Sequence, residues 1–69
     1  MMNIPRDVAE EVVPKIYRYF GAYAEVVRLL KNGMPEKDFK HAMNLLGEAY
    51  SPMDSFLKQI FEKYPDLAE

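Results

Sequence analysis

Hydrophobic residues recur along most of the chain at intervals of three and four, the spacing of one face of an α-helix. In the first half this set is Ala9, Val13, Ile16, Phe20, Tyr23, Val27 and Leu30. A second set runs beside it with the same spacing: Val12, Ile16, Tyr19, Tyr23, Val26 and Leu30. The two sets predict a helix over about residues 5–31, with an apolar face that covers about half of its surface.

The second half of the chain continues this spacing in one unbroken series: Phe39, Met43, Leu46, Tyr50, Met53, Leu57, Ile60 and Tyr64. Between the halves, Asn32 and Gly33 favour left-handed backbone conformations that end a helix, and Pro35 suits the start of the next one. Tyr64 precedes a proline, which disfavours helical geometry and predicts the end of the second half.

Two prolines interrupt these patterns, and both project from the solvent side of the helix. Pro14 has no capping side chain near it, so we expect a kink around residues 11–14. Ser51 is a typical N-cap, Pro52 suits the first helical position, and Asp54 stands where an acidic residue completes a capping box. These residues predict a break between two nearly collinear helices over residues 35–50 and 52–64.

The predicted fold is a single all-α domain over residues 1–69. In it, the long kinked helix packs antiparallel on the two shorter ones as a helical hairpin. The first arm's apolar face is wider than one antiparallel helix covers, so we expect two hairpins to dimerise into a helical bundle. A compact three-helix monomer is the alternative. The residues predicted to form the partner or dimer interface are Val12, Ile16, Tyr19, Tyr23, Val26, Leu29 and Leu30.

The composition of the chain limits the compartment and the partners that we expect for this domain. The chain has 69 residues, no cysteine and a net charge of −2. We therefore expect no disulfide framework and a cytoplasmic location, and the net charge argues against nucleic acid as a partner, because nucleic-acid binders are usually basic. The beginning of the chain does not resemble a signal peptide, and the apolar runs are too short to span a membrane.

Residues with catalytic or metal-binding chemistry are few. His41 is the single histidine, so one chain cannot supply a histidine-based metal site, and an inter-subunit site is the remaining possibility. Ser51 is better explained as a helix cap than as a nucleophile, and whether it is modified is open. We expect no catalytic residue, cofactor, metal or small-molecule substrate.

The leading functional hypothesis is a small non-enzymatic protein–protein interaction module, a regulator, inhibitor or adaptor that works as a homodimer. Another protein of unknown identity would be its target. The alternative is a DNA-binding regulator with a degenerate helix-turn-helix around residues 39–58, with Gly47 at the turn. An acidic residue, Asp54, near the start of its reading helix complements phosphates poorly.

Overall fold

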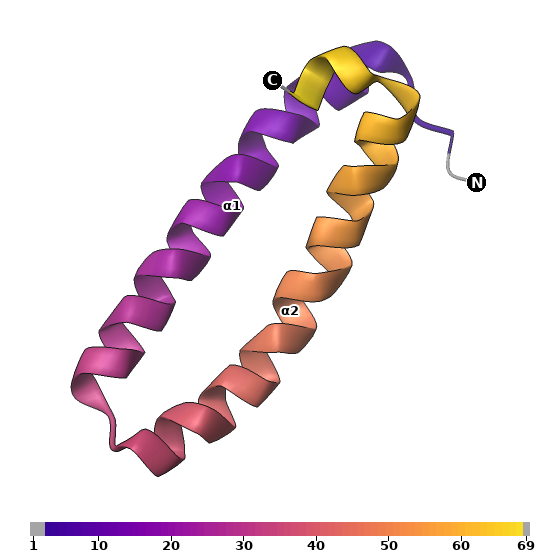
Figure 1. The fold of residues 1–69 in the computed structure, drawn as a ribbon. Helices are drawn as coiled ribbons and strands as arrows, with labels where there is room; N and C mark the ends of the chain where they lie inside the picture. The colour runs from indigo at the N-terminus through magenta and orange to yellow at the C-terminus, as the bar shows by residue number, and fades with distance from the viewer. Residues whose placement is uncertain (1–2, 69) are drawn as a thin grey trace.

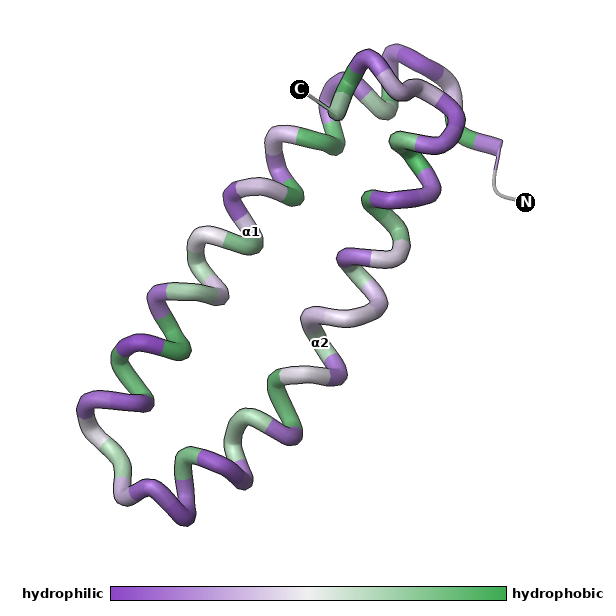
Figure 2. The backbone as a smooth tube through the Cα atoms, in the orientation of Figure 1, coloured by the Kyte–Doolittle hydropathy of each residue, from purple (hydrophilic) through white to green (hydrophobic). Residues whose placement is uncertain are grey.

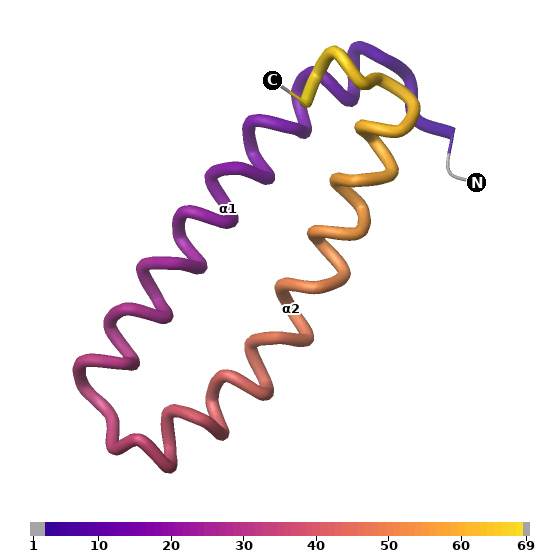
Figure 3. Tube along the Cα trace, in the orientation of Figure 1, coloured from indigo at the N-terminus to yellow at the C-terminus, as the bar shows by residue number. Residues whose placement is uncertain are grey.

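The computed structural model describes residues 3–68 and shows an all-α chain (Figure 1). Helix α1 spans Arg6–Gly33 and helix α2 spans Glu36–Lys63, and a short 3-10 helix, η1, covers Pro65–Ala68. The two long helices lie side by side and antiparallel as a hairpin (Figure 3). The first and last described residues meet at one end, called here the terminal end, and the α1–α2 connection forms the loop end.

Prolines set the ends of both helices. Met34 and Tyr64 each precede a proline and adopt extended or non-helical backbone angles, and their N–H groups close the last turns on Leu30 and Ile60. The expected left-handed ending at Asn32 and Gly33 is wrong, because no described residue has a positive φ and Gly33 belongs to α1. The steric demand of Pro35 on Met34 is enough to end the helix.

The predicted break at Ser51–Pro52 is also wrong. Helix α2 continues through both residues, so there is no helix start for Ser51 to cap. Pro52 removes one backbone hydrogen bond, to the carbonyl of Glu48, and both residues are exposed. The apolar series keeps its phase across this point, so a single helix retains all its packing on α1 at the cost of one hydrogen bond. Helix α1 continues through Pro14, as predicted for one long helix over about residues 5–31.

The core lies at the terminal end of the hairpin. The buried hydrophobic residues in the described part of the chain are Ile4, Ala9, Val13, Ile16, Leu57 and Ile60. Hydropathy mapped on the backbone shows hydrophobic positions recurring along the inner sides of both helices (Figure 2). Burial is nevertheless deepest where the start of α1 meets the end of α2, and that half of the hairpin supplies most of the packing energy.

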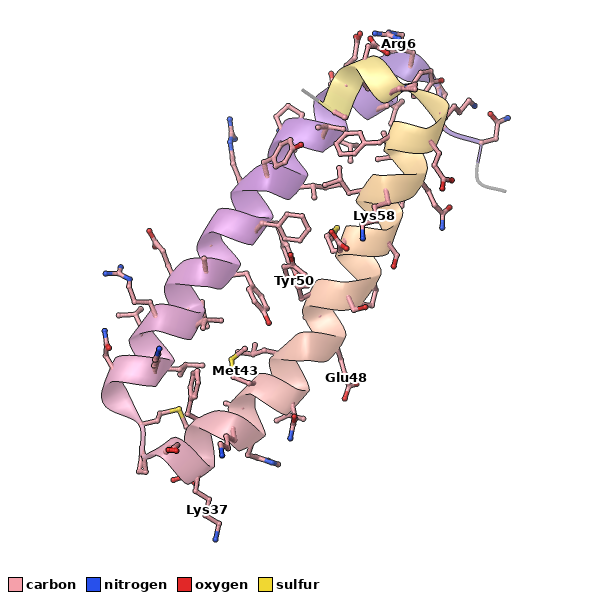
Figure 4. All side chains as sticks on the ribbon, viewed as in Figure 1. Arg6, Lys37, Met43, Glu48, Tyr50 and Lys58 are labelled. Atoms are coloured by element: carbon pink, nitrogen blue, oxygen red, sulfur yellow. The ribbon has the colours of Figure 1, made fainter. Side chains whose placement is uncertain are left out.

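Polar contacts reinforce the terminal end. The Tyr64 hydroxyl donates to the carbonyl of Ile4 at 2.8 Å, and Lys63 Nζ donates to Asn3 Oδ1 at 2.7 Å. Arg6 forms an ion pair with Asp66 in η1 and lies over the Tyr64 ring, 5.5 Å from its centroid (Figure 4). These contacts, called here the terminal clasp, join residues about 60 positions apart in the chain.

The loop half of the hairpin is packed less completely. Its inward-facing hydrophobic residues are only partly buried: Phe20, Tyr23, Val27, Leu30, Phe39, Met43 and Leu46. The radius of gyration is 14.9 Å, against about 11 Å for a compact chain of this length. The exposed surface is 5266 Å², against about 4500 Å² for an average monomer of this mass. The chain is an extended hairpin, so the compact three-helix monomer is not the fold observed.

Candidate interaction surface

One face of the hairpin carries two adjoining apolar hollows between α1 and α2. The larger, of about 460 Å³, is lined by Val12, Ile16, Glu48, Ala49, Pro52, Met53 and Phe56. The smaller, of about 230 Å³, is lined by Tyr19, Ala22, Tyr23, Val26, Leu46 and Ala49. Because Ala49 lines both, the hollows form one continuous trough, called here the groove, in which Glu48 is the single charged lining residue.

Exposed hydrophobic side chains extend this groove. Val26 lines it and is 43% exposed. By helical spacing, Val8 stands one turn before Val12, Leu29 one turn after Val26, and Leu45 one turn before Ala49. Leu29 and Leu45 are 65% and 60% exposed. Together with the groove, these residues make the groove face, which continues along the helices toward both ends.

Contacts between α1 and α2 fix which residues of the two helices face each other across the groove. The Tyr19 hydroxyl donates to the carbonyl of Ala49 at 3.0 Å. Close by, the Phe20 and Tyr23 rings lie 5.0 and 5.2 Å from the Tyr50 ring, measured between centroids. Tyr50 points toward α1, whereas Glu48 points away from it (Figure 4). The aromatic cluster and the hydrogen bond thus connect the middle of α1 to the middle of α2.

Of the seven residues predicted for the interface, the structure brings five into the groove: Val12, Ile16, Tyr19, Tyr23 and Val26. Leu30 is partly buried toward the loop end, and Leu29 is exposed on the groove face. The α2 wall of the groove was missed by sequence reasoning. A second apolar series on α2 could have revealed it, because it steps by three and four: Ala42, Leu45, Ala49, Pro52 and Phe56.

The opposite face of the hairpin is more polar. It carries the ion pair between Asp54 and Lys58, at 3.1 Å, and Tyr17, which is 47% exposed. A hollow of about 320 Å³ between α1 and η1 is lined there by Glu10, Val13, Pro14, Tyr17 and Leu67. This hollow is lined by residues from the first half of α1 and from η1 and, like the groove, includes one carboxylate.

The candidate polar chemistry does not converge on a site. His41 is exposed and borders a hollow of about 560 Å³ whose other lining residues, Glu36, Lys37, Lys40 and Asn44, all come from α2. Within residues 3–68, no three histidine or acidic side chains stand close enough to hold a metal ion. Ser51 and Ser55 are exposed on the same helix.

The perturbed titrations belong to the terminal clasp and not to the groove. Hydrogen bonds from Arg6 hold the pKa of the Asp66 carboxyl below its usual value, and the same contacts, with a further one to Glu10, raise the pKa of Arg6. Both side chains are about half exposed, so the pair is a solvated structural contact whose strength depends on salt.

The helix-turn-helix considered for residues 39–58 needs a turn between two helices. Those residues lie inside the uninterrupted α2, and Gly47 stands in the middle of that helix. The structure thus removes the feature on which the DNA-binding hypothesis was based. Neither long helix, nor any other described segment, has the length and apolar character needed to cross a membrane.

The chain was compared with family models, with curated proteins and with solved structures, and no match was found in any of the three. The geometry of the groove face is therefore the basis for a functional proposal.

Proposed function

We propose that the chain is a non-enzymatic protein–protein interaction module, a regulator, inhibitor or adaptor that works as a homodimer. The observation that carries this proposal is the continuous apolar groove along one face of the hairpin, with Val26, Leu29 and Leu45 exposed on it. Contiguous exposed apolar surface of this kind is typical of interfaces in small proteins.

The area of the groove face is consistent with a stable protein–protein interface. The hairpin measures 44 by 20 Å across its two longest directions, a projected area of about 880 Å². A standard protein interface buries about 800 Å² on each partner. One hairpin therefore presents enough area for a stable interface only if its partner covers nearly the whole face, and a second extended hairpin has the right length to do so.

Energetics favour the same arrangement. A chain of this length is near the lower limit at which one hydrophobic core stabilises a fold, and here the core occupies only the terminal half. Covering the groove face would add apolar burial at about 25 cal/mol per Å² to the half that lacks it. Pairing two hairpins with twofold symmetry is the commonest way to achieve this in homodimers.

Sedimentation equilibrium over about a hundredfold range of protein concentration tests the proposal. We expect a monomer–dimer equilibrium for the wild type. Leu45→Glu should abolish the dimer, because it places a charge on the groove face. Tyr17→Glu is the matched control: Tyr17 is also an exposed large hydrophobic residue, but it lies on the opposite face. A wild type that stays monomeric at the highest concentration refutes the proposal.

A further inference from the structure

We infer that the groove face is covered by a second copy of the chain turned end for end, so that α1 packs antiparallel on α1 of the second copy and α2 on α2. This inference rests on the proposed function and specifies its geometry. It follows from the position of the groove's centre, the sizes of the facing side chains and the charges on the groove face.

The centre of the face is well defined. The midpoint of α1, Arg6–Gly33, falls between Tyr19 and Phe20, and the midpoint of α2, Glu36–Lys63, falls between Ala49 and Tyr50. These two pairs are the ones joined by the Tyr19–Ala49 hydrogen bond and the Phe20–Tyr50 ring contact. A twofold axis through this level therefore maps the full length of one hairpin onto the other.

Two face-to-face arrangements have such an axis. If the axis crosses the helices, the two copies are antiparallel and each helix faces the same helix of the second copy. Two residues then lie at the same height when their numbers add up to twice the helix midpoint, which is about 39 on α1 and about 99 on α2. If the axis runs along the hairpin, the copies are parallel, and α1 faces α2 of the second copy with sums of about 69. Because one residue rises 1.5 Å along a helix, two residues whose numbers miss one of these sums by two differ in height by about 3 Å.

Side-chain sizes fit the antiparallel arrangement. On α2, Phe56 faces Ala42 of the second copy, so a large side chain meets a small one. Ala49 faces its own copy at the axis, where a small residue permits close approach of the two helices. Met53 faces Leu46 of the second copy, a contact between two large apolar residues, and on α1 the Tyr19 side chains of the two copies come level near the axis. Alternation of large and small residues is what allows facing layers to interdigitate.

Two charges beside the groove discriminate more strongly, whereas Glu48, the charged residue that lines it, comes level with the uncharged Ser51 in the antiparallel arrangement and with Gly21 in the parallel one. Lys15 stands one turn from both Val12 and Tyr19, and Asp38 stands one turn before Ala42. In the antiparallel arrangement Lys15 comes within one residue of the level of Glu25 of the second copy, which stands one turn from both Ala22 and Leu29, and Asp38 comes within two residues of the level of Lys63. Lys63 now donates to Asn3, and its ammonium group has further donors available for a carboxylate.

The parallel arrangement leaves both charges without partners. Lys15 would lie on Pro52 and Phe56 of the second copy, because Asp54 at that height is paired with Lys58 on the opposite face. Asp38 would come level with Lys31 of the second copy, but Lys31 follows Ala24 by seven residues and so shares the opposite side of α1 with Tyr17; Asp38 would lie on Leu29 and Leu30 instead. Placing charges on apolar surface without compensation is unfavourable, so charge complementarity selects the antiparallel dimer.

Single cysteines test this geometry cleanly, since the chain has none of its own. Ala22, Ala24 and Ala49 are exposed helical alanines; Ala22 and Ala49 line the groove, and Ala24 shares the opposite side with Tyr17. Under mild oxidation, Ala49→Cys should form a disulfide-linked dimer faster than Ala24→Cys by about tenfold or more, because the axis brings the two thiols together. A tagged Ala22→Cys chain mixed with Ala49→Cys should give no such enhanced product between the two.

Each outcome bears on a different statement. Preferential linkage between positions 22 and 49 indicates the parallel arrangement and overturns the inference, while the proposed homodimer remains. A dimer in sedimentation whose Ala49→Cys chains link no faster than the Ala24→Cys control also overturns the inference alone. A monomer at every concentration overturns the proposed function, and the inference with it. Rapid Ala49→Cys linkage in a chain that sediments as a dimer supports both.

Discussion

The uneven packing of the hairpin predicts that truncating two aliphatic residues on α2 lowers stability with different dependence on protein concentration. Ile60 is fully buried at the terminal end, whereas Leu45 is 60% exposed on the groove face. We expect Ile60→Ala to destabilise the chain at any protein concentration. Leu45→Ala should leave the monomer almost unchanged and reduce stability only where the dimer is populated.

The magnitudes follow from burial. Truncating a buried isoleucine to alanine costs about 2–5 kcal/mol, against a total free energy of unfolding of about 3–10 kcal/mol for a chain of this length. In the monomer, Leu45→Ala should change that free energy by less than about 0.5 kcal/mol. Full burial of a leucine contributes about 1.5–3 kcal/mol, so covering the exposed part of Leu45 contributes about 1–2 kcal/mol per copy to the dimer.

Thermal and chemical unfolding, followed by circular dichroism at low and at high protein concentration, measures both effects. The difference between the two variants should be large at low concentration and should shrink at high concentration, where Leu45→Ala also loses stability. If Leu45→Ala were as costly as Ile60→Ala in the monomer, the loop half would be packed more tightly than the structure indicates. If it cost nothing at high concentration, the groove face would not be covered.

Three further predictions concern single contacts. Tyr19→Phe should lower the free energy of unfolding by about 0.5–1.5 kcal/mol in denaturant titrations, because it removes one hydrogen bond between the helices. Since Arg6 lowers the pKa of Asp66 in the folded chain, their contact stabilises the chain at neutral pH and is lost as pH falls below about 4. The protection of amides at the start of α1 against hydrogen exchange, measured relative to the intrinsic exchange rate at each pH, should therefore fall with acid in the wild type and fall less in Asp66→Asn. Ser51→Ala should change stability by less than about 0.5 kcal/mol, whereas a loss of about 1 kcal/mol would restore the rejected helix cap.

Hydrophobic spacing was sufficient to predict the all-α fold and the extent of both arms. The steric effect of a proline on the preceding residue predicted the end of α2 before Pro65, and the same effect ends α1 at Met34. The errors have one cause in common. Ser51 and Asp54 near Pro52, and Asn32 with Gly33, are local signals, and each was assigned the backbone geometry that its residue types prefer in isolation. Packing along α1 and the demand of Pro35 override those preferences.

Only half of the groove could be predicted from the sequence. The α1 wall follows from an apolar face that is too wide for one partner helix. The α2 wall depends on Ala49 and Pro52, which are a small residue and a helix breaker and do not stand out as apolar, and on Phe56, which lies off the main series. Which residues of α1 stand opposite which residues of α2 is set by the contacts of Tyr19 and Tyr50 between the helices. The spacing of hydrophobic residues within each helix does not specify this alignment.

Pro52 lies inside helix α2, which it weakens, and it also lines the groove. Its replacement is the last prediction. In the monomer, Pro52→Ala should raise the free energy of unfolding by up to about 3 kcal/mol, because a helix-interior proline lacks its hydrogen bond. In the dimer the same change removes about two methylene groups from the groove, a loss of up to about 1.5 kcal/mol per copy. The variant should therefore be more stable at low concentration yet associate more weakly in sedimentation.

Pro14→Ala is the matched control: Pro14 lies inside α1 near the opposite face, so its removal should raise stability and leave association unchanged. Equal effects of the two changes on association would show that the Pro52 ring has no part in covering the groove.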